Sequence, residues 1–323
     1  MIDGHIHYAE SIGEDRTLSI IEEYHLKGIG LQCIPKGGIQ KVEEDAFRLK
    51  KKCNVPVYIF GGIGREVYQL SEEDMKKELV IEAKRLMEMG CTGIKMLEGK
   101  PQVRKNHPIP DFDQSVWDEY FSYLEEERIP VYMHVNDPEE FWDETKVSDF
   151  AKKAGWFYDE TFINNEEQYR QIMKMLEKHP HLKILFPHFF FMSKQLNRLA
   201  EIMDRYQEVR IDVTPGIELF LNLSDDIDNA RKFFAKYEDR ILYGTDIGAR
   251  SVIKQENALL SMEESRARIS LVTGFLEQKG DYILNPDAYY AGDSSRIMHG
   301  LGLSDKQLKK IYEENFLHFI ERI

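Results

Sequence analysis

Disulfide bonding, export and membrane insertion have little support in this sequence. The 323 residues include only three cysteines, an odd number, and Cys33, Cys53 and Cys91 each lie in or beside an apolar run. No apolar run approaches the ~20 residues that a membrane-spanning helix needs, and no charged leader with an apolar core precedes the first predicted strand. We therefore expect reduced thiols in a cytoplasmic protein that does not enter a membrane.

An excess of basic residues is also missing. Asp and Glu number 57 against 43 Lys and Arg, so the formal net charge is −14. Proteins that bind nucleic acid usually carry a basic face, so we expect no nucleic-acid partner. Hydrophobic residues make up 42% of the chain, with 18 Phe and 16 Tyr among them, which is enough for a large core. The chain is therefore expected to fold as a globular protein.

Short apolar runs alternate with longer segments of helical period. The predicted strands cover residues 2–8, 29–34, 55–60, 91–97, 130–135, 182–186, 209–213 and 241–244. Segments between them, such as 71–90 and 166–180, repeat apolar residues at helical spacing, and Ser71 and Ser304 mark helix starts. This alternation favours a parallel sheet, and eight strand-helix units favour an α/β fold of the (β/α)8 TIM-barrel type, with an open doubly wound sheet as the alternative. No linker rich in Gly, Pro or Ser interrupts the chain, so residues 1–323 are predicted to form one domain.

Three connections are too long for simple loops. They follow the fourth, fifth and eighth predicted strands and cover residues 98–116, 136–165 and 247–303. In a barrel, the connections from each strand to the next helix lie at one end, where active sites form. We expect these three connections to form a lid over the active site.

Residues that bind metals recur where the predicted strands end. His5 and His7 end the first strand, His134 the fifth and His188 the sixth, and Asp246 follows the eighth. Residues two apart on a strand point to the same face, so both imidazoles of the first pair can bind one ion. A further His and a carboxylate would complete a mixed nitrogen and oxygen site with a position left for water, which suits a catalytic divalent metal.

Each of these residues alone has a simpler interpretation. A single HxH pair, a lone His134 or a lone His188 is more often a packed or hydrogen-bonded residue, and Asp246 alone could be a helix N-cap. The combination favours a metal site because five such residues at four different strand ends are improbable from packing alone. A second HxH pair, His179 and His181, precedes the strand at 182–186, so we predict that both lie on the surface away from the site.

The pattern resembles the amidohydrolase superfamily, and within it the branch typified by aminocarboxymuconate semialdehyde decarboxylase. The resemblance rests on the HxH pair, on the histidines that end the fifth and sixth strands, and on the Asp of the GTD motif after the eighth. It extends to HVNDPEEFW at 134–142 and to the closing segment LKKIYEENFLHFI with Asn315. In this branch, metal-dependent hydrolases, lactonases, hydratases and decarboxylases share one barrel.

The ligands that the resemblance implies for one divalent ion are His5, His7, His134 and Asp246. Zn²⁺ is the favoured ion, and Mn²⁺ is the alternative. The resemblance also implies His188 as a nearby acid or base, and Asp246 as the base that takes a proton from water. Lys95 stands where binuclear relatives carry a carbamylated lysine, so a second ion is the alternative to an ordinary ammonium group. A homodimer is expected from the family alone.

The predicted substrate is a small anionic molecule. Arg65, Lys95 and Arg250 are the predicted substrate-binding residues, and Lys100 and Arg104 lie in the same region. Cations at the active end of an acidic protein favour a carboxylated substrate, although pairing with acidic neighbours is the alternative. The expected reaction is hydrolysis of an ester, lactone or amide bond. Non-oxidative decarboxylation with the same ligands is the second interpretation, and a non-catalytic metal-binding barrel is the third.

Overall fold

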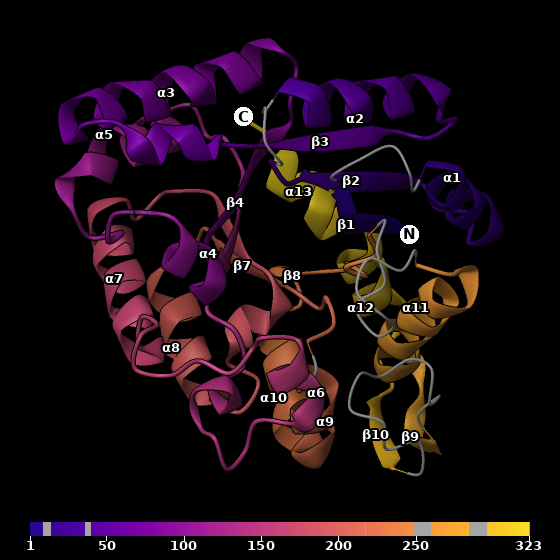
Figure 1. Ribbon diagram of the computed structural model, residues 1–323. Coiled ribbons are helices and arrows are strands. Elements are labelled where there is room, and N and C mark those ends of the chain that lie inside the picture. Colours follow the sequence, from indigo (N-terminus) through magenta and orange to yellow (C-terminus); the bar gives the residue numbers. More distant parts are fainter. Residues whose placement is uncertain (9–13, 36–39, 217, 249–259, 284–295, 323) are drawn as a thin grey trace.

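Eight parallel strands form the centre of the molecule. The computed structural model describes residues 1–8, 14–35, 40–216, 218–248, 260–283 and 296–322. The strands pair in the order β1 to β8. Figure 1 shows β1, β2 and β3 side by side. They are β1 (Ile2–Tyr8), β2 (Gly28–Cys33), β3 (Val57–Gly62), β4 (Gly93–Gly99), β5 (Val131–Val135), β6 (Ile184–Phe186), β7 (Val209–Asp212) and β8 (Ile241–Leu242). All eight coincide with the predicted runs, with ends displaced by two residues at most.

Backbone hydrogen bonds close this sheet into a barrel. Gly4 N donates to Tyr243 O at 3.1 Å, and His7 N donates to Ile247 O at 2.7 Å. These bonds join β1 to the chain at and beyond the end of β8, so the first strand has a neighbour on both sides. The predicted (β/α)8 barrel is therefore confirmed, and the open doubly wound sheet is wrong.

Helices follow the strands and cover the outside of the barrel. The α-helices are α1 (Glu14–Glu23), α2 (Gln40–Lys52), α3 (Glu72–Glu88), α4 (Pro101–Asn106), α5 (Asp118–Glu126), α6 (Asp149–Lys153), α7 (Asn165–Lys178), α8 (Leu196–Arg205), α9 (Leu219–Asp225), α10 (Ile227–Lys236), α11 (Met262–Glu277), α12 (Asp305–Lys309) and α13 (Asn315–Ile320). Shorter helical turns are η2 (Arg65–Gln69), η3 (Ser115–Trp117), η4 (Glu139–Trp142), η5 (His188–Phe191) and the π-helical η7 (Lys310–Glu314). Within the described residues, no helix is long and apolar enough to cross a bilayer.

Two of the helix starts confirm the sequence prediction. Ser71 Oγ accepts a hydrogen bond from Asp74 N at 3.2 Å and caps α3. Ser304 and Gln307 form a capping box at the start of α12. Both caps satisfy backbone N–H groups that have no partner within the helix.

The N-terminal end of the barrel is filled by apolar side chains. Helix α13 lies against this end, and its Phe316 and Phe319 pack among buried residues of the strands, namely Ile2, Phe60, Tyr132, Leu185 and Leu242. Since this end is closed, a substrate can enter only from the C-terminal ends of the strands. That is the end at which the predicted polar residues lie.

The long connections contain structure of their own. The connection after β4 holds α4. The connection after β5 holds η4 and α6, with a small core of Phe141, Val147, Ala151 and Tyr158. Trp142 and Trp156 pack against this core, so these aromatic residues stabilise the insertion.

The connection after β8 was predicted as part of a lid, and its internal structure was not foreseen. It holds α11 and an antiparallel hairpin of β9 (Lys279–Ile283) and β10 (Ile297–Leu301). The hairpin escaped prediction because β9 reads KGDYI and alternates between exposed and half-buried residues, without a buried apolar face.

Candidate metal centre

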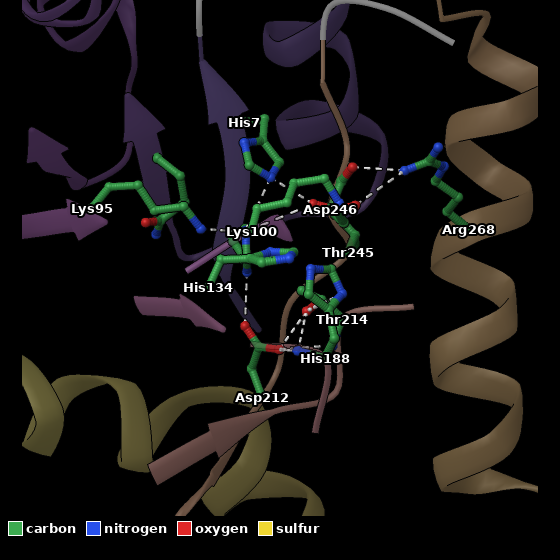
Figure 2. Close-up of polar contacts among 12 residues, drawn as sticks. His7, Lys95, Lys100, His134, His188, Asp212, Thr214, Thr245, Asp246 and Arg268 are labelled. Carbon is green, nitrogen blue, oxygen red and sulfur yellow. Dashed lines mark hydrogen bonds and ion pairs between the residues drawn. The ribbon is translucent and has the colours of Figure 1, made fainter. Parts of the chain in front are cut away.

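Three predicted ligands converge at the open end of the barrel. His5 and His7 belong to β1, and Asp246 lies just after β8. Figure 2 shows His7 and Asp246 facing each other. His7 Nε2 is 2.7 Å from Asp246 Oδ1, His5 Nε2 is 3.7 Å from the same oxygen, and the two Nε2 atoms are 3.3 Å apart. Among the described residues, these three form the group whose ligand atoms lie close enough together to hold one metal ion.

The contacts within this group fit a bound cation. Asp246 Oδ1 is buried and has no hydrogen-bond partner, although His7 Nε2 lies 2.7 Å away. Buried polar atoms in proteins almost always have a partner, so a carboxylate oxygen that faces two imidazole nitrogens without a formal hydrogen bond fits a cation-binding site. Two imidazoles and a carboxylate are donors that Zn²⁺ and Mn²⁺ accept. The residues present therefore fit a divalent metal ion.

A buried carboxylate orients His5. Asp212, at the end of β7, places Oδ2 2.8 Å from His5 Nδ1, and both side chains are fully buried. An ionised carboxylate accepts hydrogen bonds, so the His5 proton belongs on Nδ1 and the Nε2 lone pair is free for a metal. Asp212 Oδ1 also accepts from His188 N at 2.8 Å and from Thr214 N at 3.1 Å. One carboxylate thus connects β1, β6 and β7 beneath the site.

Lys95 reaches the same point from β4. Its Nζ lies 3.3 Å from His5 Nε2, and its side chain is buried (Figure 2). Burial lowers the pKa of Lys95 to about 8, which leaves the amine mostly charged at neutral pH. The structure brings the predicted lysine to the ligands, and its alternative role toward a second ion stays a prediction.

His134 and His188 stand beside the three-residue group rather than within it. Their rings are 5.2 Å apart, and the His188 ring is 5.8 Å from that of His5. Burial lowers the pKa of each to about 4, so both are neutral at physiological pH. His134 Nε2 is buried without a hydrogen-bond partner, 3.4 Å from Asp137 Oδ1. Its role as a fourth ligand stays a prediction.

A left-handed turn places His188. The φ angles of His188, Phe189, Phe190 and Phe191 in η5 are 55°, 58°, 57° and 52°. Side chains other than glycine pay ~1 to 2 kcal/mol per residue in this region. Hydrogen bonds offset part of this, because His188 N donates to Asp212 and Tyr169 OH donates to Phe190 O at 2.9 Å. Such strain is typical of functional sites, and here it stacks Phe191 on His188 with ring centroids 5.0 Å apart.

The carboxylate of Asp246 is ionised. Burial by itself would raise the pKa of Asp246, but the neighbouring imidazoles, above all that of His7 at 2.7 Å, lower it well below its usual value. Asp246 also has a positive φ, of 55°. The residue is therefore held in an uncommon conformation with a charged side chain that faces the imidazoles.

Two of the predicted mouth cations are already paired. Lys100 Nζ contacts both carboxylate oxygens of Asp137, at 2.7 and 2.8 Å. Arg104 Nη2 lies 2.5 Å from Asp111 Oδ1. These two residues therefore form the pairs with acidic neighbours that were the alternative interpretation, and a role toward substrate stays a prediction.

Arg65 and Arg250, the two arginines predicted to bind substrate, are not shown in ion pairs of this kind. Arg65 Nη1 lies 2.8 Å from His107 Nε2, and no carboxylate of the described residues forms an ion pair with Arg65. Arginine is always a donor, so His107 accepts this bond through a neutral imidazole. Arg250 lies outside the described residues.

Two buried ionisable residues were missed. Arg268 of α11 donates from Nη1 to the backbone oxygen of Asp246 at 2.6 Å (Figure 2). Glu218, before α9, is buried with neither carboxylate oxygen hydrogen-bonded within the described residues. Burial, together with the charges of Glu140 and Asp137, raises the pKa of Glu218 to about 8. A charged residue among the apolar residues of α11 was the one available signal for Arg268, and nothing in the sequence distinguished Glu218.

The prediction that His179 lies on the surface is wrong. His179 is 4% exposed, and its ring centroid lies 5.8 Å from that of Phe121 in α5. It directly follows α7 and lies beside α5, with Nδ1 3.8 Å from Glu125 Oε2. His181 is exposed, as predicted.

The chain is similar to known proteins in sequence and in fold. A family model described as "Amidohydrolase" matches residues 65–315. Among solved structures, the chain is similar to 4-oxalomesaconate hydratase from Rhodopseudomonas palustris, with 13% identity and a TM-score of 0.56 over 100% of this chain and 96% of that one. No curated protein sequence matches.

Two further structures are similar at comparable levels. A dihydroorotase from Campylobacter jejuni is 14% identical, with a TM-score of 0.54 over 98% of this chain and 82% of that one. A dihydroxybenzoic acid decarboxylase from Polaromonas sp. JS666, with bound manganese and an inhibitor, is 12% identical, with a TM-score of 0.54 over 98% and 97%. Identities this low show a shared fold and nothing finer.

Proposed function

The chain belongs to the amidohydrolase family, and from that premise we propose that it hydrolyses an ester, lactone or amide bond in a small carboxylated molecule. Because the family match spans residues 65–315, the protein is an enzyme of the metal-dependent hydrolase or lyase type. The observation that carries the proposal is the convergence of His5, His7 and Asp246, with the buried Asp246 Oδ1 left without a hydrogen-bond partner.

Zn²⁺ is the ion we propose for this site. A divalent cation, when bound, supplies a Lewis acid that polarises a carbonyl group and acidifies water. The mixed nitrogen and oxygen donors suit Zn²⁺, and the manganese in the Polaromonas decarboxylase supports Mn²⁺ as the alternative. We keep His134 as the proposed fourth ligand because its Nε2 is buried without a hydrogen-bond partner.

The chain's own residues can move the proton that hydrolysis requires. Asp246 is ionised and partly exposed, so its carboxylate can accept a proton from water. His188 Nδ1 is 3.4 Å from Thr214 Oγ1, whose own hydrogen goes to Asp212. Thr214 Oγ1 therefore accepts from Nδ1–H, which leaves the Nε2 lone pair of a neutral His188 to accept a hydrogen bond from substrate or water.

Unpaired cations support an anionic substrate. Arg65 and Lys95 have no carboxylate partner among the described residues, whereas Lys100 and Arg104 do. A guanidinium group without an acidic partner can bind a substrate carboxylate through two parallel hydrogen bonds. Arg250 remains a proposed third cation of this kind.

Non-oxidative decarboxylation is the second candidate. The similarity to the Polaromonas decarboxylase along 98% of the chain favours it. Lys95 also favours it, because a buried amine with a pKa of about 8 can return a proton to the carbon atom that loses CO₂. The two reactions differ in their products, so assay of the products separates them.

Metal analysis of the purified protein tests the site. The wild-type protein should hold a stoichiometric divalent ion by mass spectrometry, and the double variant His5→Ala/His7→Ala should lose it. His181→Ala, which changes an exposed histidine, is the matched control and should retain the ion. A wild-type protein that binds neither Zn²⁺ nor Mn²⁺ would contradict the proposal.

A substrate screen tests the reaction. The metal-loaded enzyme should be incubated with carboxylated esters, lactones, amides and aromatic acids, with CO₂ release and bond hydrolysis measured separately. Hydrolysis that depends on His5 and His7 supports the main proposal. CO₂ release with the same dependence supports the second candidate instead.

We also propose that the protein is cytoplasmic and forms a homodimer. Cys33, Cys53 and Cys91 are free thiols, which supports a cytoplasmic protein. A homodimer is proposed from the family resemblance, and sedimentation velocity of the purified protein tests it.

A further inference from the structure

We propose that Arg268 is a positioning residue of the metal site, which holds Asp246 in the conformation that presents Oδ1 to the ion. The inference rests on the proposed function, because it takes Asp246 as a metal ligand. Arg268 lies on α11, in the connection after β8, and its guanidinium points at Asp246 (Figure 2). Its side chain is 1% exposed, so the contact is shielded from water.

Both peptide groups of Asp246 form hydrogen bonds with other segments of the chain. Its N–H donates to His5 O at 2.9 Å, and its carbonyl oxygen accepts from Arg268 Nη1 at 2.6 Å. Asp246 has a φ of 55°, in the left-handed region that side chains disfavour. Without the guanidinium, the carbonyl would lose this partner and the peptide could turn toward an ordinary conformation. The side chain would then turn away from His7.

Arg268 also distinguishes the two carboxylate oxygens. Its Nη1 lies 4.0 Å from Asp246 Oδ2, whereas Oδ1 lies 2.7 Å from His7 Nε2. The guanidinium therefore attracts Oδ2 to one side while Oδ1 faces the imidazoles. This arrangement presents Oδ1 to the side of the carboxylate where an ion would be held by His5 and His7.

A neighbour on the same helix provides a control. Glu264 Oε1 lies 3.5 Å from Arg268 Nη2, and both side chains are buried. The variant Glu264→Gln weakens this ion pair within α11 but leaves the contact between Arg268 and Asp246 in place. It therefore reports what a disturbance of the helix does without loss of the positioning contact.

Metal affinity is the readout that a purely structural role would not change. Competition with a chelating dye measures the dissociation constants of Zn²⁺ and Mn²⁺. The proteins to compare are the wild type, Arg268→Gln, Arg268→Lys and Glu264→Gln. Thermal unfolding of each metal-free protein measures its stability. Partners that orient metal ligands typically contribute about 10- to 100-fold to affinity, and we expect a loss of that size for Arg268→Gln. Arg268→Lys, which keeps the charge and a donor, should recover part of it. Glu264→Gln should lower the melting temperature while its metal affinity stays that of the wild type.

The outcomes separate this inference from the proposed function. Equal metal affinity in Arg268→Gln and the wild type would show that Arg268 only anchors α11. If Arg268→Gln does not fold, the double variant Arg268→Gln/Glu264→Gln, which has no unpaired buried charge, decides in its place. Its affinity should fall below that of Glu264→Gln, and equality would overturn the inference. A wild type that binds no metal would overturn the proposed function instead.

Discussion

Glu218 is a buried acid that should make the protein less stable as the pH rises. Its side chain lies over Gly216, where an added Cβ would be 2.6 Å from Oε2, and no residue of the described chain hydrogen-bonds either oxygen. The charges of Glu140 and Asp137 oppose its ionisation further. Replacing it with Gln removes the ionisable group and keeps nearly the same shape.

The size of this loss of stability follows from the pKa values of Glu218 in the unfolded and the folded protein. The pKa of Glu218 rises from 4.5 to about 8 on folding. An acid with a raised folded pKa stabilises the protein fully below its unfolded pKa, and this contribution is lost as the pH rises toward the folded value. The free energy of unfolding should fall by ~1.4 kcal/mol per pH unit between about pH 5 and pH 8, and by ~5 kcal/mol at most. Glu218→Gln should lack this dependence.

Urea unfolding of the metal-free protein at several pH values measures the effect. The curves of the wild type and Glu218→Gln should meet near pH 5 and separate with rising pH, with the variant more stable at pH 8. Glu201→Gln, which changes an exposed residue, should follow the wild type throughout. Parallel curves for the wild type and Glu218→Gln would refute the argument that Glu218 folds in its neutral form.

Three further predictions concern the neighbourhood of the ligands. Gly244→Ala should weaken metal binding and lower the melting temperature, because the added Cβ would lie 2.7 Å from His5 Cβ. Dye competition measures the metal affinity and calorimetry the melting temperature, and an unchanged affinity would contradict this prediction. Thr214→Val should cost ~1 to 3 kcal/mol in urea unfolding, because the buried Asp212 and His188 N lose a partner. Arg65→Met should raise the KM of a carboxylated substrate at least about tenfold, because a charge-assisted hydrogen bond is lost. The KM of an uncharged analogue should stay unchanged. Equal effects on the two KM values would exclude recognition of the carboxylate by Arg65.

The main outline of the fold could be predicted because buried parallel strands leave a strong pattern. Such strands are covered on both faces and appear as continuous apolar runs, as in 29–34 and 182–186. The HxH pair was informative because alternate residues of a strand share a face, and His5 and His7 do converge. The β9–β10 hairpin has no buried apolar face, so the same reasoning could not detect it.

The site was predicted in part, since only contacts along one strand can be read from spacing. Asp246 was predicted from its place after the last strand and does meet the histidines. How far His134 lies from the other three residues could not be predicted from spacing, because that distance depends on how β5 is placed relative to β1. The burial of His179 depends likewise on where α5 lies, because Phe121 of that helix contacts its ring.

The sequence by itself determined the alternation of strands and helices, the placement of histidines and an aspartate at strand ends, and the acidic charge. These properties follow from local periodicity and composition, which need no knowledge of distant contacts. Tertiary structure alone decided that Arg268 meets the backbone of Asp246, that Asp212 orients His5, that Glu218 has no hydrogen-bond partner among the residues that the structure describes, and that four consecutive residues adopt left-handed angles. Each of these depends on segments far apart in the chain, and their distances are set only when the barrel closes.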